Sequence, residues 1–242
     1  MCRRAAAAVA VLVMAVLAAC APPAAGPRTT EVIFYGDSIM SSVMDQVTGL
    51  LGAAAPDYRT TDRTRWGTAP CDSWSQMNAD TGRRPAVVVV EYVGNMVTDC
   101  TRGRTAGDVY GNDLARAVDL WQRYGTKVVL VVAPAPTGTL PADHTAGNAA
   151  RTVAASRHTE LVDVAGSYVD PATGRYAQVV PCTPGDVDCT DPGAVVRSPD
   201  GWHLCDHAAL NSLVCPVTAG TRRLVGPLMA TLTPLVTSPS NA

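Results

Sequence analysis

The sequence predicts one α/β domain, a three-layer α/β/α sandwich with a central parallel sheet. Three observations support this class: short apolar runs recur along the chain, segments with helical spacing lie between them, and the length left after removal of an export segment suits one domain. Continuous apolar, β-branched runs are typical of strands that are covered on both faces. Their alternation with helices favours a doubly wound sheet.

Five segments are expected to form strands. The strongest is 86–92, which contains a run of valines. Residues 31–35 and 127–132 have the same apolar character, and residues 58–62 and 160–163 are weaker candidates. The core has to be built from Val, Leu, Ala and Ile, because only 5% of the residues are aromatic and the chain has one Phe.

Helical spacing is clearest from Asp108 to Tyr124, where Leu114, Val118 and Trp121 recur at steps of four and three. Such a stripe predicts a helix packed against the sheet. A second helix is expected directly after Ser38, because apolar residues continue on one side as far as position 50.

The last third of the chain is less regular. From 170 to 199 the periodicity is replaced by Pro, Gly and Asp, and two cysteines in this stretch favour ordered, functional loops. A closing helix is expected over 219–236. Pro227 and Pro234 are expected to shorten it, because proline lacks the N–H that a helix needs.

Residues 1–19 have the parts of an export signal. Two arginines precede an apolar run over 5–16, and Leu17-Ala18-Ala19-Cys20 follows. These four residues resemble a bacterial lipobox, which implies cleavage before Cys20 and a diacylglycerol on its side chain. The apolar run is short and ends at Pro22, which disfavours a transmembrane helix.

The predicted organisation is therefore a lipoprotein signal peptide (1–19), a flexible tether (20–30) and a folded domain (31–242). The tether is rich in Pro, Ala and Gly, as expected of a flexible linker. This places the domain at the outer face of the cell membrane, with secretion without an anchor as the alternative.

Export changes the interpretation of the cysteines, because disulfides form outside the cytoplasm. Six remain in the domain, and this even number predicts three disulfides. Sequence alone does not determine the pairing. The expected pairs are Cys71 with Cys100, Cys182 with Cys189, and Cys205 with Cys215, of which the last two close short loops.

The charge distribution argues against nucleic-acid binding. The formal net charge is −2, and no segment concentrates arginine or lysine into a stripe that would follow a phosphate backbone. The partners expected are instead a small-molecule or glycan substrate and a membrane.

Polar residues follow predicted strands, or close the long loop, at three places. Gly36-Asp37-Ser38 follows the first strand, Gly94-Asn95 follows the valine-rich strand, and Asp200-Gly201-Trp202-His203 ends the irregular stretch. In open parallel sheets, ligands bind beyond the carboxyl ends of the strands. Each segment alone is an ordinary turn sequence, but their combination in this order predicts a site.

These segments resemble the motif blocks of the SGNH hydrolase family, also called GDSL-type esterases and lipases. Residues 36–39 match the first block with Ile39 in place of the usual Leu, Gly94-Asn95 matches the third, and Asp200 with His203 matches the DxxH block. Gly67 is the candidate for the second block, which is only a glycine in a loop. The resemblance spans nearly the whole mature chain, and it implies the flavodoxin-like SGNH fold and ester chemistry that needs no metal or organic cofactor.

The residue types suit nucleophilic catalysis. A serine hydroxyl is a weak nucleophile until a base takes its proton, and the base needs a third group that fixes its tautomer. Ser38 is the expected nucleophile, His203 the base and Asp200 its orienting partner. The resemblance implies an oxyanion hole made by the backbone N–H groups of Ser38 and Gly67 and the side-chain amide of Asn95.

Other classes fit less well. The chain has no Gly-x-Ser-x-Gly elbow, which disfavours an α/β-hydrolase. His203 and His207 have the spacing of a metal site, but Cys205 between them is expected to form a disulfide, so no metal is predicted.

Several side chains near the motifs allow two interpretations. One set either recognises an acidic or sugar substrate or is solvated: Arg63, Arg65 and Arg102. Another either stacks on sugar rings or packs in the fold: Trp66, Trp74 and Trp202. Among the remaining polar residues, His144 and His158 are expected to be solvated, His207 to lie at the surface or beside the site, and Asp37 to support its own turn.

The expected function is a serine esterase that removes an O-acyl group from a cell-envelope carbohydrate or a lipid through an acyl-enzyme on Ser38. Acyl transfer with the same triad is one alternative, and a non-catalytic envelope-binding lipoprotein of the same fold is another. The protein is expected to be a monomer, held at the membrane by the lipid on Cys20.

Overall fold

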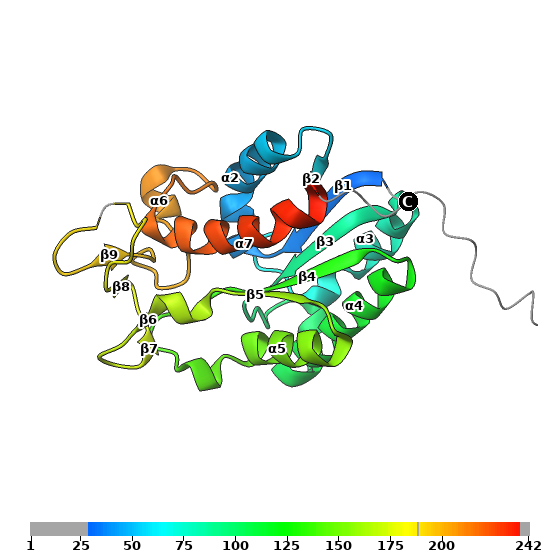
Figure 1. The fold of residues 1–242 in the computed structure, drawn as a ribbon. Coiled ribbons are helices and arrows are strands. Elements are labelled where there is room, and N and C mark those ends of the chain that lie inside the picture. Colours follow the sequence, from blue (N-terminus) through cyan, green and yellow to red (C-terminus); the bar gives the residue numbers. More distant parts are fainter. Residues whose placement is uncertain (1–28, 188, 238–242) are drawn as a thin grey trace, which may run out of the picture.

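The computed structural model describes residues 29–187 and 189–237, so the predicted signal peptide, Cys20 and most of the tether lie outside it. A five-stranded parallel sheet forms the centre (Figure 1). Its strands are ordered β2 (Arg59–Asp62), β1 (Thr29–Gly36), β3 (Pro85–Glu91), β4 (Lys127–Val132) and β5 (Glu160–Asp163). The strand order reverses between β1 and β3, as in a flavodoxin-like doubly wound sheet.

All five predicted strands are present, with ends that differ by at most a few residues from the prediction. β1, β3 and β4 are almost wholly buried, which explains their continuous apolar runs. β1 begins at Thr29, two residues before the predicted start of the domain, because the Thr29 N–H donates to the Arg84 carbonyl at 3.0 Å.

Helices cover both faces of this sheet, which confirms the three-layer prediction (Figure 1). On one face lie α2 (Ser38–Ala54) and α7 (Ala219–Thr237), which contact each other. On the other lie α4 (Asp113–Arg123) and α5 (Thr145–Arg157). The predicted helix over 108–124 is divided into a π-helical turn, η4 (Asp108–Asn112), and α4.

Among the helices of seven or more residues in the described part of the chain, two were not predicted from the sequence. α5 buries mainly Ala146, Ala150 and Ala154, whose small side chains give little apolar contrast. α3 (Trp74–Asp80) is too short for a clear period. The remaining short helices are η1 (Pro70–Ser73), η2 (Thr81–Arg83), η3 (Asp99–Thr101), η5 (Pro141–Asp143), η6 (Ala165–Tyr168) and α6 (His207–Leu210).

The predicted shortening of the closing helix is wrong. α7 continues through both prolines to Thr237. Leu224, Leu228 and Leu232 are buried at steps of four, whereas Pro227 and Pro234 are exposed on the solvent side. Burial of this apolar stripe against the sheet and α2 therefore outweighs the hydrogen bonds that the prolines cannot make.

Two small antiparallel strand pairs form in the predicted irregular region, at one end of the molecule (Figure 1). β6 (Val169–Asp170) pairs with β7 (Arg175–Tyr176), and β8 (Val179–Val180) pairs with β9 (Ala194–Val195). Among residues 29–187 and 189–237, no helix has the length and apolar content to cross a membrane.

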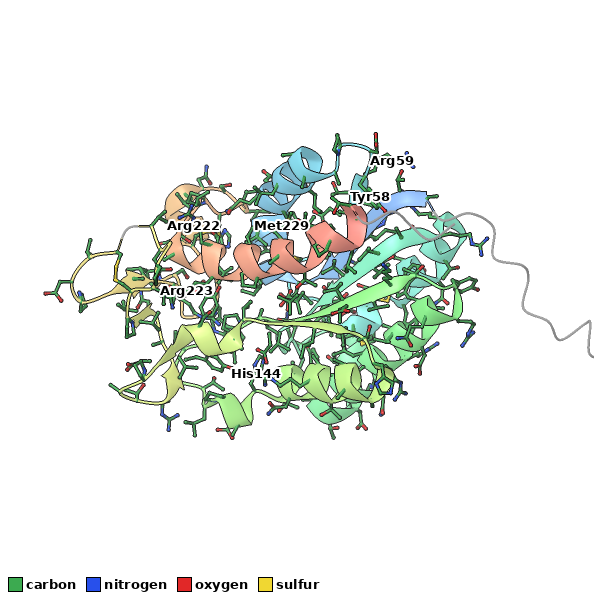
Figure 2. The ribbon with its side chains drawn as sticks, in the orientation of Figure 1. Tyr58, Arg59, His144, Arg222, Arg223 and Met229 are labelled. Atoms are coloured by element: carbon green, nitrogen blue, oxygen red, sulfur yellow. A yellow bond between two sulfur atoms is a disulfide. The ribbon has the colours of Figure 1, made fainter. Side chains whose placement is uncertain are left out.

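His144 is buried rather than solvated, which corrects the prediction. It precedes α5 and points into the fold (Figure 2), where it is 3% exposed and meets the Tyr176 ring edge-on at 5.8 Å. Burial lowers the pKa of His144 to about 4. The burial of His144 could not be predicted from the sequence, because the helix that follows it has little apolar periodicity.

Candidate active site

Ser38 lies where the carboxyl end of β1 turns into α2. Asp37 caps the helix, because its Oδ1 accepts the Ile39 N–H at 3.0 Å. Gly36 has to lack a side chain, since a Cβ there would lie 2.7 Å from the Met40 Cβ. The turn thus places Ser38 at a helix N-terminus, where backbone N–H groups favour negative charge.

The three predicted triad residues come together at this turn. His203 Nε2 lies 3.2 Å from Ser38 Oγ, and His203 Nδ1 lies 2.7 Å from Asp200 Oδ2. Both distances are within hydrogen-bonding range. Positions 38 and 203 are distant in sequence, so only tertiary packing brings them into contact.

Asp200 is held in an acceptor role by four donors. Its Oδ1 accepts the backbone N–H groups of Trp202 at 2.7 Å and His203 at 3.1 Å, together with the Ser198 hydroxyl. Partial burial raises the pKa of Asp200, but these bonds and the one from His203 outweigh it and leave the pKa well below its usual range. Asp200 is therefore an ionised partner for the imidazole.

Arg197 fixes the segment that carries Asp200 and His203, and it was missed in the sequence. It is 1% exposed and donates to the carbonyls of Trp202, Pro134 and Ala135, which joins the segment to the end of β4. Burial lowers its pKa to about 10, so it remains charged at neutral pH. An arginine in an irregular stretch is ordinarily solvated, and nothing in the sequence distinguishes this one.

Further contacts hold the same segment. The Ser198 N–H donates to the His203 carbonyl at 2.8 Å, and the Thr137 N–H donates to the Gly201 carbonyl at 2.9 Å. Gly201 has φ +75°, and a Cβ there would lie 2.3 Å from Thr137 Oγ1. Glycine is required at this position both for the backbone conformation and for the close approach.

Asn95, one of the predicted oxyanion residues, already donates hydrogen bonds to other protein groups. Its Nδ2 donates to Asp37 Oδ2 at 3.0 Å and to the Thr68 carbonyl at 3.1 Å. An amide nitrogen carries two hydrogens, so Asn95 donates to an oxyanion only by exchanging one of these bonds. Gly67 is on an exposed turn with φ +69°, which favours glycine.

Asp37 does more than support its own turn. Its Oδ2 accepts the Val93 N–H at 2.9 Å as well as the Asn95 amide, so one carboxylate connects α2 with the segment that follows β3. Burial raises the pKa of Asp37 to about 6, although these donors oppose the shift. Asp37 thereby positions both the helix that begins at Ser38 and the side chain of Asn95.

A second buried carboxyl group, Glu91, lies at the end of β3. Its Oε2 accepts the Met40 N–H at 3.3 Å, and its Oε1 has no hydrogen-bond partner among the described residues. Burial raises the pKa of Glu91, and the nearby charge of Asp37 raises it further. Glu91 is therefore the protonated member of this pair.

Glu91→Gln is expected to stabilise the protein increasingly as the pH rises. The folded-state pKa of Glu91 lies above the value of about 4.3 in an unfolded chain, so the folded state keeps a proton that the unfolded state releases. Stability is therefore lost from about pH 4 up to the pH at which buried Glu91 ionises. Glutamine does not ionise, so its advantage should grow by up to about 1.4 kcal/mol per pH unit over this window.

Urea denaturation of both proteins between pH 5 and 8 measures this difference. Glu160→Gln, at an exposed position, is the matched control and should change the free energy of unfolding little. A difference between wild type and Glu91→Gln that stays constant with pH would show that Glu91 is ionised throughout.

The three tryptophans have different environments. Trp66 stacks on the His203 ring, with centroids 5.1 Å apart and an interplanar angle of 19°. Trp74 lies under the Arg116 guanidinium at 3.8 Å. Trp202 is half exposed beside the triad. Of the three, Trp202 is the most exposed.

His207 also lies beside the triad. Its ring meets the His203 ring edge-on at 5.0 Å and the Trp66 ring at 4.7 Å. Its Nδ1 is 2.9 Å from the Ser212 carbonyl, so this nitrogen carries a hydrogen. Of the two interpretations of His207, the structure therefore supports the one beside the site.

The arginines near the site have protein partners. Arg63 is paired with buried Asp80 at 2.9 Å, and Arg102 is paired with exposed Asp99. Arg65 donates from Nη2 to the Asp72 carbonyl at 2.8 Å. The interpretation of these residues as structural or surface groups is thus better supported than substrate recognition.

The structure contains the three expected disulfides: Cys71–Cys100, Cys182–Cys189 and Cys205–Cys215. The first connects the segments that carry Gly67 and Asn95, and the third encloses His207. Cys205, Cys215 and His207 lie close enough for metal ligands, but the two sulfurs are bonded to each other. Cys205 and Cys215 therefore form a disulfide beside His207 and are not free to bind a metal.

A cavity of about 940 Å³ lies between α2, α7 and the segment 183–186, away from the triad. Arg223 and Asp186 form a buried ion pair in its wall, and Arg223 is labelled at the start of α7 in Figure 2. None of Ser38, Asp200 and His203 lines this cavity. The chemistry-bearing side chains are thus at the carboxyl end of the sheet and not in this hollow.

Solved structures with this fold include esterases and lipases. TesA is 22% identical, with a TM-score of 0.57 over 85% of this chain and 99% of TesA. The acetyl xylan esterase AlAXEase is 17% identical, with a TM-score of 0.58 over 84% of this chain and 99% of its own. A GDSL-like lipase from Bacteroides thetaiotaomicron is 15% identical, with a TM-score of 0.50 over 84% and 87%.

No family model matches the sequence, and no curated protein matches it significantly. At the identities above, the structural matches establish the fold. This chain has the three-layer α/β/α architecture found in GDSL-type esterases and lipases.

Proposed function

We propose that this protein is a serine hydrolase of the SGNH type, which cleaves an ester through an acyl-enzyme on Ser38. The observation that carries the proposal is the chain of contacts from Ser38 Oγ through His203 to Asp200, at 3.2 and 2.7 Å. The motif blocks of the sequence and the fold shared with esterases support the same class.

In the proposed reaction, Ser38 Oγ attacks the ester carbonyl carbon while its proton passes to His203 Nε2. Asp200 holds Nδ1–H and stabilises the imidazolium. The tetrahedral intermediate collapses when His203 returns the proton to the departing alcohol. Water then attacks the acyl-enzyme by the same steps, which releases the acid and restores Ser38.

The oxyanion is proposed to be stabilised by the backbone N–H groups of Ser38 and Gly67 and by Asn95. Because both hydrogens of the Asn95 amide are engaged, the oxyanion would take over the bond that Thr68 or Asp37 accepts in the free protein. The Thr68 carbonyl is neutral, so its bond is the weaker of the two and the one expected to be exchanged.

The proposed substrate is an O-acyl ester of a cell-envelope carbohydrate or of a lipid. An acetyl xylan esterase among the structures of this fold and the half-exposed Trp202 favour a carbohydrate. We further propose export by the signal peptide 1–19 and anchoring through a lipid on Cys20, followed by the tether. The three disulfides support an oxidising compartment.

A fluorophosphonate probe tests the proposal directly. The purified domain is expected to be labelled once, with the adduct mapped by mass spectrometry to the peptide that contains Ser38, and to hydrolyse p-nitrophenyl acetate. A non-catalytic binding protein would give neither result. If the protein is labelled but turns over p-nitrophenyl acetate only when a sugar acceptor is added, it is an acyltransferase.

A further inference from the structure

Trp66 covers one face of the imidazole of His203, and we infer that it is a positioning residue for that histidine. The inference rests on the proposed function. The indole and the imidazole are nearly parallel, 19° apart, with centroids separated by 5.1 Å. Such a stack restricts rotation of His203 about its side-chain bonds and keeps Nε2 directed at Ser38 Oγ.

The stack also stabilises charge. When His203 accepts the proton of Ser38, its ring becomes a cation that faces the electron-rich surface of the indole. Asp200 acts on the same cation in the plane of the ring, at Nδ1, 2.7 Å away. Trp66 therefore supplies an interaction from a direction that the carboxylate does not reach, and it is strongest in the state in which His203 is charged.

The loop that carries Trp66 is fixed before substrate arrives. The Thr68 hydroxyl donates to the Arg65 carbonyl at 2.7 Å, and the Ala69 N–H donates to Asp72 Oδ2 at 2.8 Å. The Cys71–Cys100 disulfide then joins the end of this loop to the segment after Asn95. The indole is thus presented to His203 by an ordered turn, although 36% of its surface is exposed.

Few charged groups face His203. Asp200 lies on its own turn, Asp37 lies behind Ser38, and His207 touches both rings. Burial lowers the pKa of His207, and a charge on His203 lowers it further. His207 is therefore neutral near pH 7, and it completes the aromatic surroundings of His203 without opposing its charge.

The alternative role for Trp66 is a platform for a sugar ring, and kinetics separates the two. A platform acts on substrate binding, so its loss raises KM for a glycan and leaves p-nitrophenyl acetate unaffected. A positioning residue acts on kcat with any ester.

The experiment compares Trp66→Leu, Trp66→Met and Trp66→Phe with wild type on p-nitrophenyl acetate between pH 5 and 9. The two variants without a ring are expected to lose about tenfold in kcat, with KM changed less than about twofold. Phenylalanine should restore most of the loss. Tyr124→Leu, at an equally exposed ring near the opposite end of the sheet, should behave as wild type.

A wild-type kcat in Trp66→Leu or Trp66→Met would overturn the inference, and an increase in KM alone would assign Trp66 to substrate binding. Trp66→Met keeps a long apolar side chain, so it can be measured in place of Trp66→Leu if the leucine variant does not fold. Failure of the proposed function gives a different result, since wild type itself would then not hydrolyse the ester.

Discussion

Ser38→Ala is expected to lower kcat for p-nitrophenyl acetate by roughly 10⁴- to 10⁶-fold, because no other hydroxyl replaces the attacking group. KM should change little, since the removed oxygen is small and the surrounding loops are fixed by their own hydrogen bonds. The helix should also remain intact, because its cap is the Asp37 carboxylate and not the Ser38 hydroxyl. Initial rates and circular dichroism of the two proteins measure both expectations.

Ser41→Ala is the matched control for this variant. Ser41 lies three residues further along α2 and is partly buried, so the same chemical change is made in the same helix. Wild-type rates are expected for it. If Ser38→Ala retained more than about a tenth of wild-type activity, Ser38 would not be the nucleophile, and the hydrolysis would have to be assigned elsewhere.

Asp200→Asn is expected to lower kcat by about 10⁴-fold while leaving the fold in place. In the wild type, Asp200 Oδ1 accepts the backbone N–H groups of Trp202 and His203. The side-chain oxygen of asparagine can accept the same two bonds. The amide nitrogen then faces His203 Nδ1 and donates to it, so the imidazole hydrogen moves to Nε2. His203 would be held in the tautomer that cannot take a proton from Ser38.

Asp119→Asn removes a half-exposed carboxylate that pairs with Arg157, and it serves as the control because it lies outside the site. Its activity should match wild type. Activity of Asp200→Asn within tenfold of wild type would contradict the orienting role, and Ser38 and His203 would then have to act as a dyad.

A helix or strand could be predicted where its buried residues were clearly more apolar than the residues around them in the sequence. The valine run that became β3 is buried on both faces, and neither a turn nor a polar face interrupts it. α5 was not predicted because most of its buried residues are alanines, whose small side chains give little apolar contrast with the rest of the helix. The expectation that the prolines would shorten α7 was wrong. It considered only the missing N–H groups and not the burial of Leu224, Leu228 and Leu232.

Some residues of the candidate site could be predicted from the sequence, and others could be found only in the structure. Ser38, Asp200 and His203 could be proposed from the sequence, because the short segments that carry them resemble motif blocks of the SGNH hydrolase family. Arg197, Glu91 and Trp66 act through contacts with segments far away in the sequence. The engagement of Asn95 by Asp37 and Thr68 likewise depends on where two loops meet.

By itself the sequence predicted the parallel sheet and, from an even number of cysteines in the domain, three disulfides whose pairing it left open. The apolar pattern carries the information about the sheet, because it acts between neighbours along the chain. The candidates Ser38, Asp200 and His203 came from the resemblance of their segments to SGNH motif blocks. Only the tertiary structure decided which polar groups are buried and which rings touch. Burial and stacking arise when distant segments exclude water from each other, and the order of residues along the chain does not record that.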